Sequence, residues 1–358
     1  MALSAGAPGV SSEQTVVDRP RERAAGEALR ALDPDFLPQL RTSLSRHICA
    51  HVPALHEFIE PLLDSNAKYL RPVVVRLASA FGHPERGALL DLSVVIELVH
   101  TASLFHDDMI DRSPTRRGKT ALHCTHGRLT AVLAGALLLH LSSHIVRGIR
   151  LASPAVESRL HEIFASAAVD ICRGQWKESL NTGNIETDEA LYMEIIELKT
   201  ARLFEISFQA GALVSGGPEE ALREFGHHFG LLYQIADDLR DLFAPLEEQK
   251  RPPGGDLRAG TYTLPVIRGL RKENSPLARL LRNRTSEMSP ESIADYVAGF
   301  LRGDAAGYSL ALASSCGARA KAAIGGLPRI PEHAILLDMV DDTVDSLTSL
   351  LERARAVA

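Results

Sequence analysis

The sequence predicts an all-α fold, and three observations support this. Apolar residues recur every three or four positions along most of the chain, which is the spacing of a buried helical face. The alternating apolar and polar pattern of strands is scarce. Hydrophobic residues make up 45% of the 358 residues, enough for one large core. We therefore expect a single all-α domain over 29–358, preceded by a flexible leader at 1–28.

Individual helices follow from this spacing. Residues 94–111 (VVIELVHTASLFHDDMID) place their apolar side chains on one stripe. Residues 131–146 (AVLAGALLLHLSSHIV) are apolar nearly all round, which predicts a helix in the middle of a bundle. A long helix is expected over 190–216, closed by two glycines, and another over 229–243 (FGLLYQIADDLRDLF).

Four stretches interrupt the helical pattern, at 82–84, 113–119, 182–186 and 245–260. The last of them (PLEEQKRPPGGDLRAG) is the longest loop expected within the core of the chain. Long loops in compact helical domains are often lids over a functional site. We therefore expect 245–260 to act as a lid.

Composition and charge exclude several classes of function. The formal net charge is −6, so there is no general basic field to attract nucleic acid or an anionic membrane. The four cysteines are scattered without C-x-x-C spacing, which favours reduced thiols in the cytoplasm over disulfides or a zinc site. No uninterrupted apolar run approaches the ~18 residues of a membrane span. The expected protein is cytoplasmic, without a membrane span or a nucleic-acid partner.

Two clusters of aspartates share one spacing. The first holds Asp107, Asp108 and Asp111, and the second holds Asp237, Asp238 and Asp241. Side chains four residues apart on a helix project from one face, so the outer two of each cluster aim at one point. Crowded carboxylates raise one another's pKa unless a cation intervenes. Hard oxygen ligands of this kind favour Mg²⁺, which commonly shares its shell with substrate phosphates.

Spacing alone is weak support, because the chain contains a third cluster of the same form. Asp341, Asp342 and Asp345 repeat the spacing near the C-terminus. No histidine precedes them and no arginine pair follows them, so we interpret this third cluster as a solvated helix face.

Cations surround only the first two clusters. Arg116, Arg117 and Lys119 follow the first cluster, and Lys68 and Arg71 precede it. Lys199 and Thr200 lie between the two clusters in a mostly apolar helix. Arginine binds phosphate oxygens in a bidentate manner and lysine adds a point charge. The set predicts a site for more than one diphosphate.

At this point the sequence resembles the trans-isoprenyl diphosphate synthase (polyprenyl synthetase) family. The resemblance runs from about residue 60 to about residue 270. The elements that carry it, in the family's order, are AKYLRP, ELVHTASLFHDDMIDRSPTRRGKTALH, AVLAG, ICRGQ, ELKTA, FGLLYQIADDLRD and GGDLRAGTYTLP. The fold that it implies is a large helical bundle of the isoprenoid synthase type with a central cavity.

The resemblance implies a role for each matching residue. It makes Asp107, Asp111 and Asp237 the principal Mg²⁺ ligands, with Asp108, Asp238 and Asp241 completing the acidic walls. Isopentenyl diphosphate would be held by Lys68, Arg71, His100 and Arg117. The allylic diphosphate would be held by Arg116, Lys199, Thr200 and Gln234, with Arg251 reaching a phosphate from the lid. The family also implies a homodimer.

The chain departs from the family pattern in several places. Asn66-Ala67-Lys68 stands where the family often has Gly-Gly-Lys, and Ala136 stands where it often has an aspartate. Arg251 and Thr261 replace common lid lysines, and Thr261 supplies no charge. These changes leave the predicted metal ligands in place and affect the lid contacts.

Small residues below the first cluster predict a long product. In the family, product length is limited by bulk in the tunnel beneath this cluster, where short-chain members place an aromatic side chain. Here the positions are Ala102 and Ser103, so we expect a product longer than farnesyl diphosphate. Leu98, Leu138 and His140 are candidates for the floor of a deeper tunnel.

Two alternatives remain at this stage. A terpene cyclase, or another prenyl transferase on the same fold, needs the metal site but not the isopentenyl diphosphate pocket. A non-catalytic partner subunit of a heteromeric synthase would tend to lose aspartates. Consumption of isopentenyl diphosphate by the protein alone separates these readings.

Overall fold

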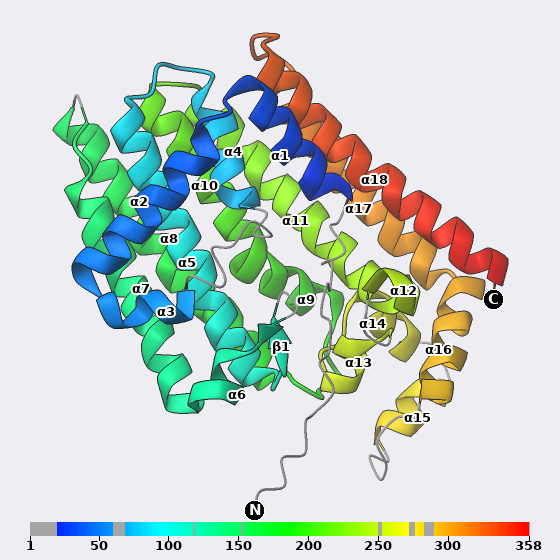
Figure 1. The fold of residues 1–358 in the computed structure, drawn as a ribbon. Coiled ribbons are helices and arrows are strands. Elements are labelled where there is room, and N and C mark those ends of the chain that lie inside the picture. The colour runs from blue at the N-terminus through cyan, green and yellow to red at the C-terminus, as the bar shows by residue number, and fades with distance from the viewer. Residues whose placement is uncertain are drawn as a thin grey trace, which may run out of the picture.

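The structure, a computed structural model, describes residues 20–59, 69–116, 119–151, 153–249, 253–271, 276–282 and 290–357. Within these ranges the regular secondary structure consists of helices and one antiparallel hairpin (Figure 1). The hairpin joins β1 (Thr115–Arg116) and β2 (Lys119–Thr120), with Thr115 opposite Thr120. The all-α prediction is confirmed.

The helices fall into three groups along the chain. The N-terminal group is α1 (Pro20–Leu32), α2 (Phe36–His51), the short 3₁₀ helix η1 (Pro53–Leu55) and α3 (His56–Ile59). The central group is α4 (Leu70–Ser79), α5 (Arg86–Ile110), α6 (Leu122–His126), α7 (Arg128–Gly148), α8 (Pro154–Leu180), α9 (Glu189–Ile196), the π-helical turn η3 (Glu197–Ala201), α10 (Arg202–Ser215) and α11 (Glu219–Phe243). The C-terminal group is α12 (Leu246–Gln249), α13 (Gly255–Ala259), α14 (Leu264–Leu270), α15 (Pro276–Arg282), α16 (Pro290–Arg302), α17 (Ala305–Ala323) and α18 (Pro331–Val357).

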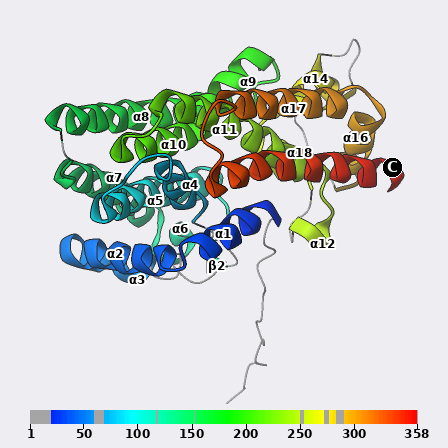
Figure 2. The same cartoon turned by 90° about the horizontal axis from the view of Figure 1, so that it is seen from above.

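The bundle is built around α11. This helix packs against α10, η3, α17 and α18, while α10 packs against α4 and α8. α5 packs against α4 on one side and α7 on another. Seen from above, α8 and α10 lie in one layer, α7, α5 and α4 in the next, and α1 and α2 outside them (Figure 2). The C-terminal ends of α5 and α11, which carry the two aspartate clusters, therefore belong to central helices of the bundle.

The predicted boundary between the leader and the domain falls within α1, the first helix that the structure describes. α1 begins at Pro20, so the expected boundary at residue 28 falls inside a helix. Ala25 and Leu29 lie one turn apart on its inner face, and both are buried against the core. Two apolar contacts among arginines, glutamates and a glycine are too short a stripe to stand out in the sequence.

α7 does not lie in the middle of the bundle, and that prediction is wrong. One face packs on α5, but Leu129, Leu133 and Leu137 on the other are 72%, 53% and 43% exposed. The neighbouring helix α8 also exposes Trp176 and Leu180. Within the described residues, nothing covers this apolar face of α7.

Two helices, α5 and α7, pass a length and hydropathy test for crossing a membrane, with 72% and 44% of the tested windows buried in the protein. A buried core helix passes the same test, so the result is weak support for a span. The expected absence of a membrane span stays a prediction.

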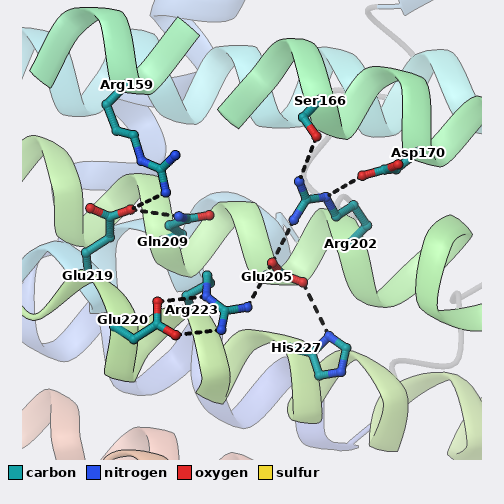
Figure 3. A network of polar contacts seen from close by, with 10 residues as sticks. All are labelled: Arg159, Ser166, Asp170, Arg202, Glu205, Gln209, Glu219, Glu220, Arg223 and His227. Atoms are coloured by element: carbon teal, nitrogen blue, oxygen red, sulfur yellow. Dashed lines mark hydrogen bonds and ion pairs between the residues drawn. The ribbon is translucent and has the colours of Figure 1, made fainter. Parts of the chain in front are cut away.

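A network of charged side chains ties α8, α10 and α11 together (Figure 3). At its centre Glu205, which is 6% exposed, accepts hydrogen bonds from Arg202 at 2.6 Å and Arg223 at 3.3 Å. His227 lies 3.3 Å from the other carboxylate oxygen of Glu205. Arg202 reaches Asp170 on α8 at 3.1 Å. None of the ten side chains drawn in Figure 3 lines the cavity described below.

Candidate active site

One large cavity opens between the central helices. Its volume is about 2470 Å³, well above the ~300–1,000 Å³ of common small-ligand pockets. Five of the six aspartates of the first two clusters line it, all but Asp108, together with Lys199, Thr200 and Gln234. Arg71, His100 and Arg116 also lie on its wall. The structure thus brings together every described residue that the sequence analysis assigned to metal or diphosphate binding.

The first cluster lies where α5 ends. Asp107 and Asp111 face the cavity, whereas Asp108 is 3% exposed and accepts a hydrogen bond from the Arg116 guanidinium at 2.8 Å. Burial raises the pKa of Asp111 to about 6, and the Asp107 carboxylate adds to the effect against the opposing charge of Lys199. Burial likewise raises the pKa of Asp107. In the protein alone these carboxylates have too little positive charge around them.

The second cluster lies near the end of α11. Asp237 is partly exposed to the cavity, and Asp238 and Asp241 are buried. Asp241 accepts a hydrogen bond at 3.0 Å from the backbone N–H of Asp256, so it anchors the first turn of α13. Asp238 accepts hydrogen bonds from the Tyr192 hydroxyl and from the Gln234 amide, each at 2.7 Å. Burial raises the pKa of Asp238 to about 7.

The six aspartates therefore divide into two sets. The first, Asp107, Asp111 and Asp237, is partly or fully open to the cavity. The second, Asp108, Asp238 and Asp241, is buried and bound by groups of the protein itself. The open set is the set predicted to ligate Mg²⁺. The buried set builds the wall behind it.

Lys199 lies between the clusters and contacts a residue that the sequence analysis missed. Its Nζ is 3.7 Å from Asp107 Oδ1 and closely contacts Glu178 of α8. Burial alone would lower the pKa of Lys199, but the Asp107 and Glu178 carboxylates outweigh it and raise the value. Lys199 is thus a fixed cation. The signal for Glu178 was its place three residues after Gln175 of the ICRGQ motif, on the same side of a helix.

A π-helical turn, Glu197–Ala201, places Lys199 and Thr200 in the cavity wall. The sequence predicts one unbroken helix over 190–216; Gly216 closes it with a φ of 69°, but the turn inside it was missed. Two glycines allow the neighbouring helices to approach this turn. A Cβ on Gly174 of α8 would lie 2.7 Å from the backbone nitrogen of Lys199, and one on Gly230 of α11 would lie 2.5 Å from the Cα of Ala201. π-helical turns are frequent at functional sites.

The two predicted substrate sides are separate groups on the cavity wall. On the allylic side, the Thr200 hydroxyl donates to Gln234 Oε1 at 2.8 Å. On the isopentenyl diphosphate side, the Arg71 guanidinium lies 3.0 Å from His100 Nε2 and 4.8 Å from the centre of the Phe204 ring. Three further predicted contacts, Lys68, Arg117 and Arg251, lie outside the described residues.

Of the residues predicted to set the product length, some line the cavity and others lie in the core. Ser103 lines the cavity, and its hydroxyl donates to the backbone oxygen of His100 at 2.8 Å. His140 also lines the cavity, with Leu139 beside it. Ala102, Leu98 and Leu138 instead lie in the core, at most 1% exposed, and are not among the lining residues. Their side chains are packed in the core, so the structure does not place them on the tunnel wall.

The departures and the third cluster can also be located. Thr261 lines the cavity where the family pattern has a lysine, and Ala136 lies half-buried on α7. Asp341, Asp342 and Asp345 are exposed on α18, and Lys321 pairs with Asp341 at 2.6 Å. The prediction of a solvated helix face is confirmed.

The open carboxylates suit a metal that needs few protein ligands. In the part of the chain that the structure describes, no three acidic, histidine or cysteine side chains converge to hold a metal ion by themselves. Mg²⁺ commonly takes one or two carboxylates and completes its shell with water and substrate phosphates. Burial raises the pKa values of Asp107 and Asp111 although Lys199 opposes it, so a bound cation would favour their ionised form. The donor set therefore fits Mg²⁺ together with a diphosphate.

The fold and the site together define an enzyme that positions anionic diphosphates inside a helical bundle, beside a cavity large enough for a long apolar chain. Comparison with known proteins gives the family. The model of the polyprenyl synthetase family matches residues 52–297. The chain therefore belongs to the polyprenyl synthetase family, as the resemblance predicts, and is a trans-prenyltransferase of isoprenoid biosynthesis.

Individual relatives and solved structures that the chain resembles carry names from the same family. Heptaprenyl diphosphate synthase component 2 of Bacillus subtilis is 32% identical over 298 residues, covering 82% of this chain and 83% of the relative. Octaprenyl diphosphate synthase of Haemophilus influenzae is 28% identical over 323 residues, covering 89% and 96%. The crystal structure of polyprenyl synthase from Caulobacter crescentus CB15, complexed with calcium and isoprenyl diphosphate, matches with a TM-score of 0.78 at 27% identity and covers 89% of this chain and 97% of that one.

Proposed function

We propose that this protein condenses isopentenyl diphosphate with an allylic prenyl diphosphate, in a Mg²⁺-dependent 1′–4 chain elongation, and that its product is longer than farnesyl diphosphate. The observation that carries the proposal is the sorting of the aspartates. The three predicted metal ligands open into one cavity that Lys199, Arg71 and His100 also line. A terpene cyclase does not bind isopentenyl diphosphate, so it would have no use for Arg71 and His100.

The residues divide the work between the two substrates. Asp107, Asp111 and Asp237 would hold Mg²⁺, which when bound supplies the positive charge that neutralises the allylic diphosphate as it leaves. Lys199, fixed by Glu178, adds a charge on the same side. Thr200 and Gln234 present oxygen dipoles to the carbon that becomes positive. Arg71 and His100 hold isopentenyl diphosphate so that its double bond faces that carbon. Positioning and electrostatics carry most of the catalysis.

The size of the cavity and the names of the relatives support a long product. Relatives include heptaprenyl, octaprenyl and nonaprenyl diphosphate synthases, and also geranylgeranyl diphosphate synthases. Ser103, a small side chain on the wall, leaves the space below the first cluster open. The test is to incubate the purified protein with allylic primers, isopentenyl diphosphate and Mg²⁺, and to size the products. Farnesyl diphosphate as the only end product would refute the length assignment.

The same product assay can test which side chain limits the length of the prenyl product. Replacing Ser103 by Phe should shorten the product, because the ring enters the cavity. Replacing Ala102 by Phe should instead disturb the core, because this position is fully buried. Products of unchanged length from the Ser103→Phe enzyme would place the limiting wall elsewhere.

A homodimer in the cytoplasm completes the proposal. The exposed apolar side chains of α7 and α8 form a surface suited to a second copy, and the four cysteines are free thiols, as expected of a reducing compartment. Sedimentation equilibrium would give twice the chain mass; a monomer at micromolar concentration would refute the dimer.

A heteromeric enzyme is the second candidate, and a specific observation favours it. Two relatives carry the name heptaprenyl diphosphate synthase component 2. The same apolar surface could then receive a different chain. Activity of the purified protein alone supports the homomeric enzyme. Inactivity that is relieved by adding a cell fraction would support the heteromer.

A further inference from the structure

A buried chain of hydrogen bonds runs from α9 to the cavity wall. Tyr192 and Asp238 are each 4% exposed, and the Tyr192 hydroxyl donates to Asp238 Oδ2 at 2.7 Å. Gln234 Nε2 donates to Asp238 Oδ1 at 2.7 Å. Thr200 Oγ1 donates to Gln234 Oε1 at 2.8 Å. The chain thus joins a tyrosine that no motif of the sequence analysis includes to two residues of the allylic side.

The donor and acceptor rules fix the direction of every bond in this chain. While Asp238 is ionised, its carboxylate only accepts hydrogen bonds, so the end of the Gln234 amide that faces it is the NH₂ group. The amide oxygen then faces Thr200, whose hydroxyl has to donate its proton. The lone pairs of the Thr200 oxygen are left for other partners. Asp238 therefore decides which end of two neighbouring dipoles is presented to their surroundings.

Those surroundings are the reaction cavity, which Thr200 and Gln234 both line. Dipoles held in advance with their negative ends toward developing positive charge lower the barrier to forming that charge. The orientation is useful only if the Asp238 carboxylate itself cannot rotate. Gln234 holds one of its oxygens, and Tyr192 holds the other.

We propose that Tyr192 is a positioning residue of the reaction: it fixes Asp238 as the acceptor that orients Gln234 and, through Gln234, Thr200 beside the allylic carbon. The inference rests on the proposed function. It assigns Asp238 to dipole orientation and leaves metal binding to Asp107, Asp111 and Asp237.

The test is the Tyr192→Phe variant, which removes one hydroxyl and keeps the ring. Loss of an outer partner of this kind typically costs about 10- to 100-fold in activity, and we expect kcat to fall by that amount. The KM for isopentenyl diphosphate and the Mg²⁺ concentration at half-maximal rate should stay within about twofold, because neither group is touched. The slow Mg²⁺-dependent hydrolysis of the allylic diphosphate without isopentenyl diphosphate should fall with kcat, since it shares the ionisation step.

Two further variants separate positioning from folding. Tyr308→Phe is the matched control, because the Tyr308 hydroxyl donates to Glu189 of the same helix α9 at 2.6 Å but lies away from the cavity. It should leave kcat unchanged. Asp238→Asn keeps the volume of the side chain but presents an NH₂ group, so it should reproduce the loss of kcat. The double variant Tyr192→Phe/Asp238→Asn should be no slower than the slower single variant, because both changes break one chain.

Three outcomes would overturn the inference: a Tyr192→Phe enzyme with the kcat of the unmodified protein, a variant that loses Mg²⁺ affinity in place of kcat, or fully additive losses in the double variant. Failure of the proposed function looks different, because the unmodified protein would then not consume isopentenyl diphosphate at all.

Discussion

Two regions of this protein bury carboxylates, and the pKa of the carboxylates is lowered in one region and raised in the other. Around Glu205, two arginines and a histidine face the carboxylate (Figure 3). Burial alone would raise the pKa of Glu205, but the His227 hydrogen bond and the Arg202 charge outweigh it and lower the value. At the end of α5, burial and crowding raise the pKa of Asp107 and Asp111, although Lys199 opposes them. In the first region the chain's own cations outweigh the effect of burial on the pKa, and in the second region Lys199 does not.

The difference separates structural from functional charge. A network completed by its own partners contributes to the stability of the fold and has nothing left to bind. A cluster that lacks positive charge costs stability in the free protein and is able to bind a cation together with its anionic substrate. Mutations of acidic residues should therefore have opposite effects in the two regions.

The largest effect is expected from Glu205→Gln. It leaves Arg202 and Arg223 with Asp170 and Glu220 as acidic partners but without the buried one, and breaking a buried ion pair from one side costs up to about 3–5 kcal/mol of the free energy of unfolding. Chemical denaturation measures this loss. Glu220→Gln is the matched control: its side chain is 71% exposed, it pairs with Arg223, and its removal should cost under about 1 kcal/mol. Equal losses in the two variants would contradict the account of the network.

Asp107→Asn should have the opposite effect: a loss of activity without a loss of stability. We expect kcat to fall by at least about 100- to 1,000-fold, because a group that stabilises charge in the transition state is lost. The metal-free protein should be as stable as before or more stable, since one of two crowded carboxylates is gone. Steady-state kinetics and thermal unfolding measure the two effects. The same change at Asp341 should alter neither; a clear loss of kcat there would undermine the distinction between the clusters.

The next largest effect is expected from a substitution that disturbs the π-helical turn. Gly230→Ala places a Cβ 2.5 Å from the Cα of Ala201, and overpacking of this kind costs about 1–3 kcal/mol. Because Lys199 and Thr200 lie on that turn, kcat should fall as well. Gly299→Ala is the control, since no atom lies within 4 Å of the added carbon and helix propensity improves. A fully active and stable Gly230→Ala enzyme would show that the close approach is dispensable.

The smallest effect is a dependence of stability on pH. The carboxyl groups of Asp111 and Asp238 have pKa values raised to about 6 and about 7, so the folded protein holds their protons more tightly than the unfolded chain does. Stability from this source is present at low pH and is lost as pH rises through 6 and 7. With a discount for the exposure of Asp111, we expect a loss on the order of 1–2 kcal/mol.

Thermal unfolding of the metal-free protein between pH 5 and pH 8 would show this loss of stability, because carboxyl groups with such raised pKa values ionise in about this range. Adding Mg²⁺ and inorganic diphosphate should reduce the part of the loss that comes from Asp111, because the cation would bind that ionised carboxylate. A profile that stays flat without metal would mean that the cluster is not short of positive charge.

Much of this could be predicted from the sequence. Helical periodicity predicted the all-α fold, and nearby cations distinguished the first two aspartate clusters from the exposed cluster on α18. What was missed depends on contacts between helices that are distant in the sequence. Glu178 and Tyr192 gain their importance from Lys199 and Asp238, on other elements. The π-helical turn depends on two glycines of neighbouring helices, which no local pattern reveals.

Some predictions failed for the same reason. Ala102 has the small side chain expected of a tunnel wall, but only the packing of α5 shows that Ser103, one residue further, is the one facing the cavity. The apolar composition of α7 predicted a central helix, because composition does not tell whether the covering surface belongs to the same chain or to another.

The most direct test of the central claim is a calorimetric titration of inorganic diphosphate into the protein with and without Mg²⁺. The cluster is proposed to be complete only when cation and diphosphate are both present. Binding should therefore require both, disappear in Asp107→Asn, and persist in Glu220→Gln. Diphosphate binding of equal strength without a divalent cation would contradict the account.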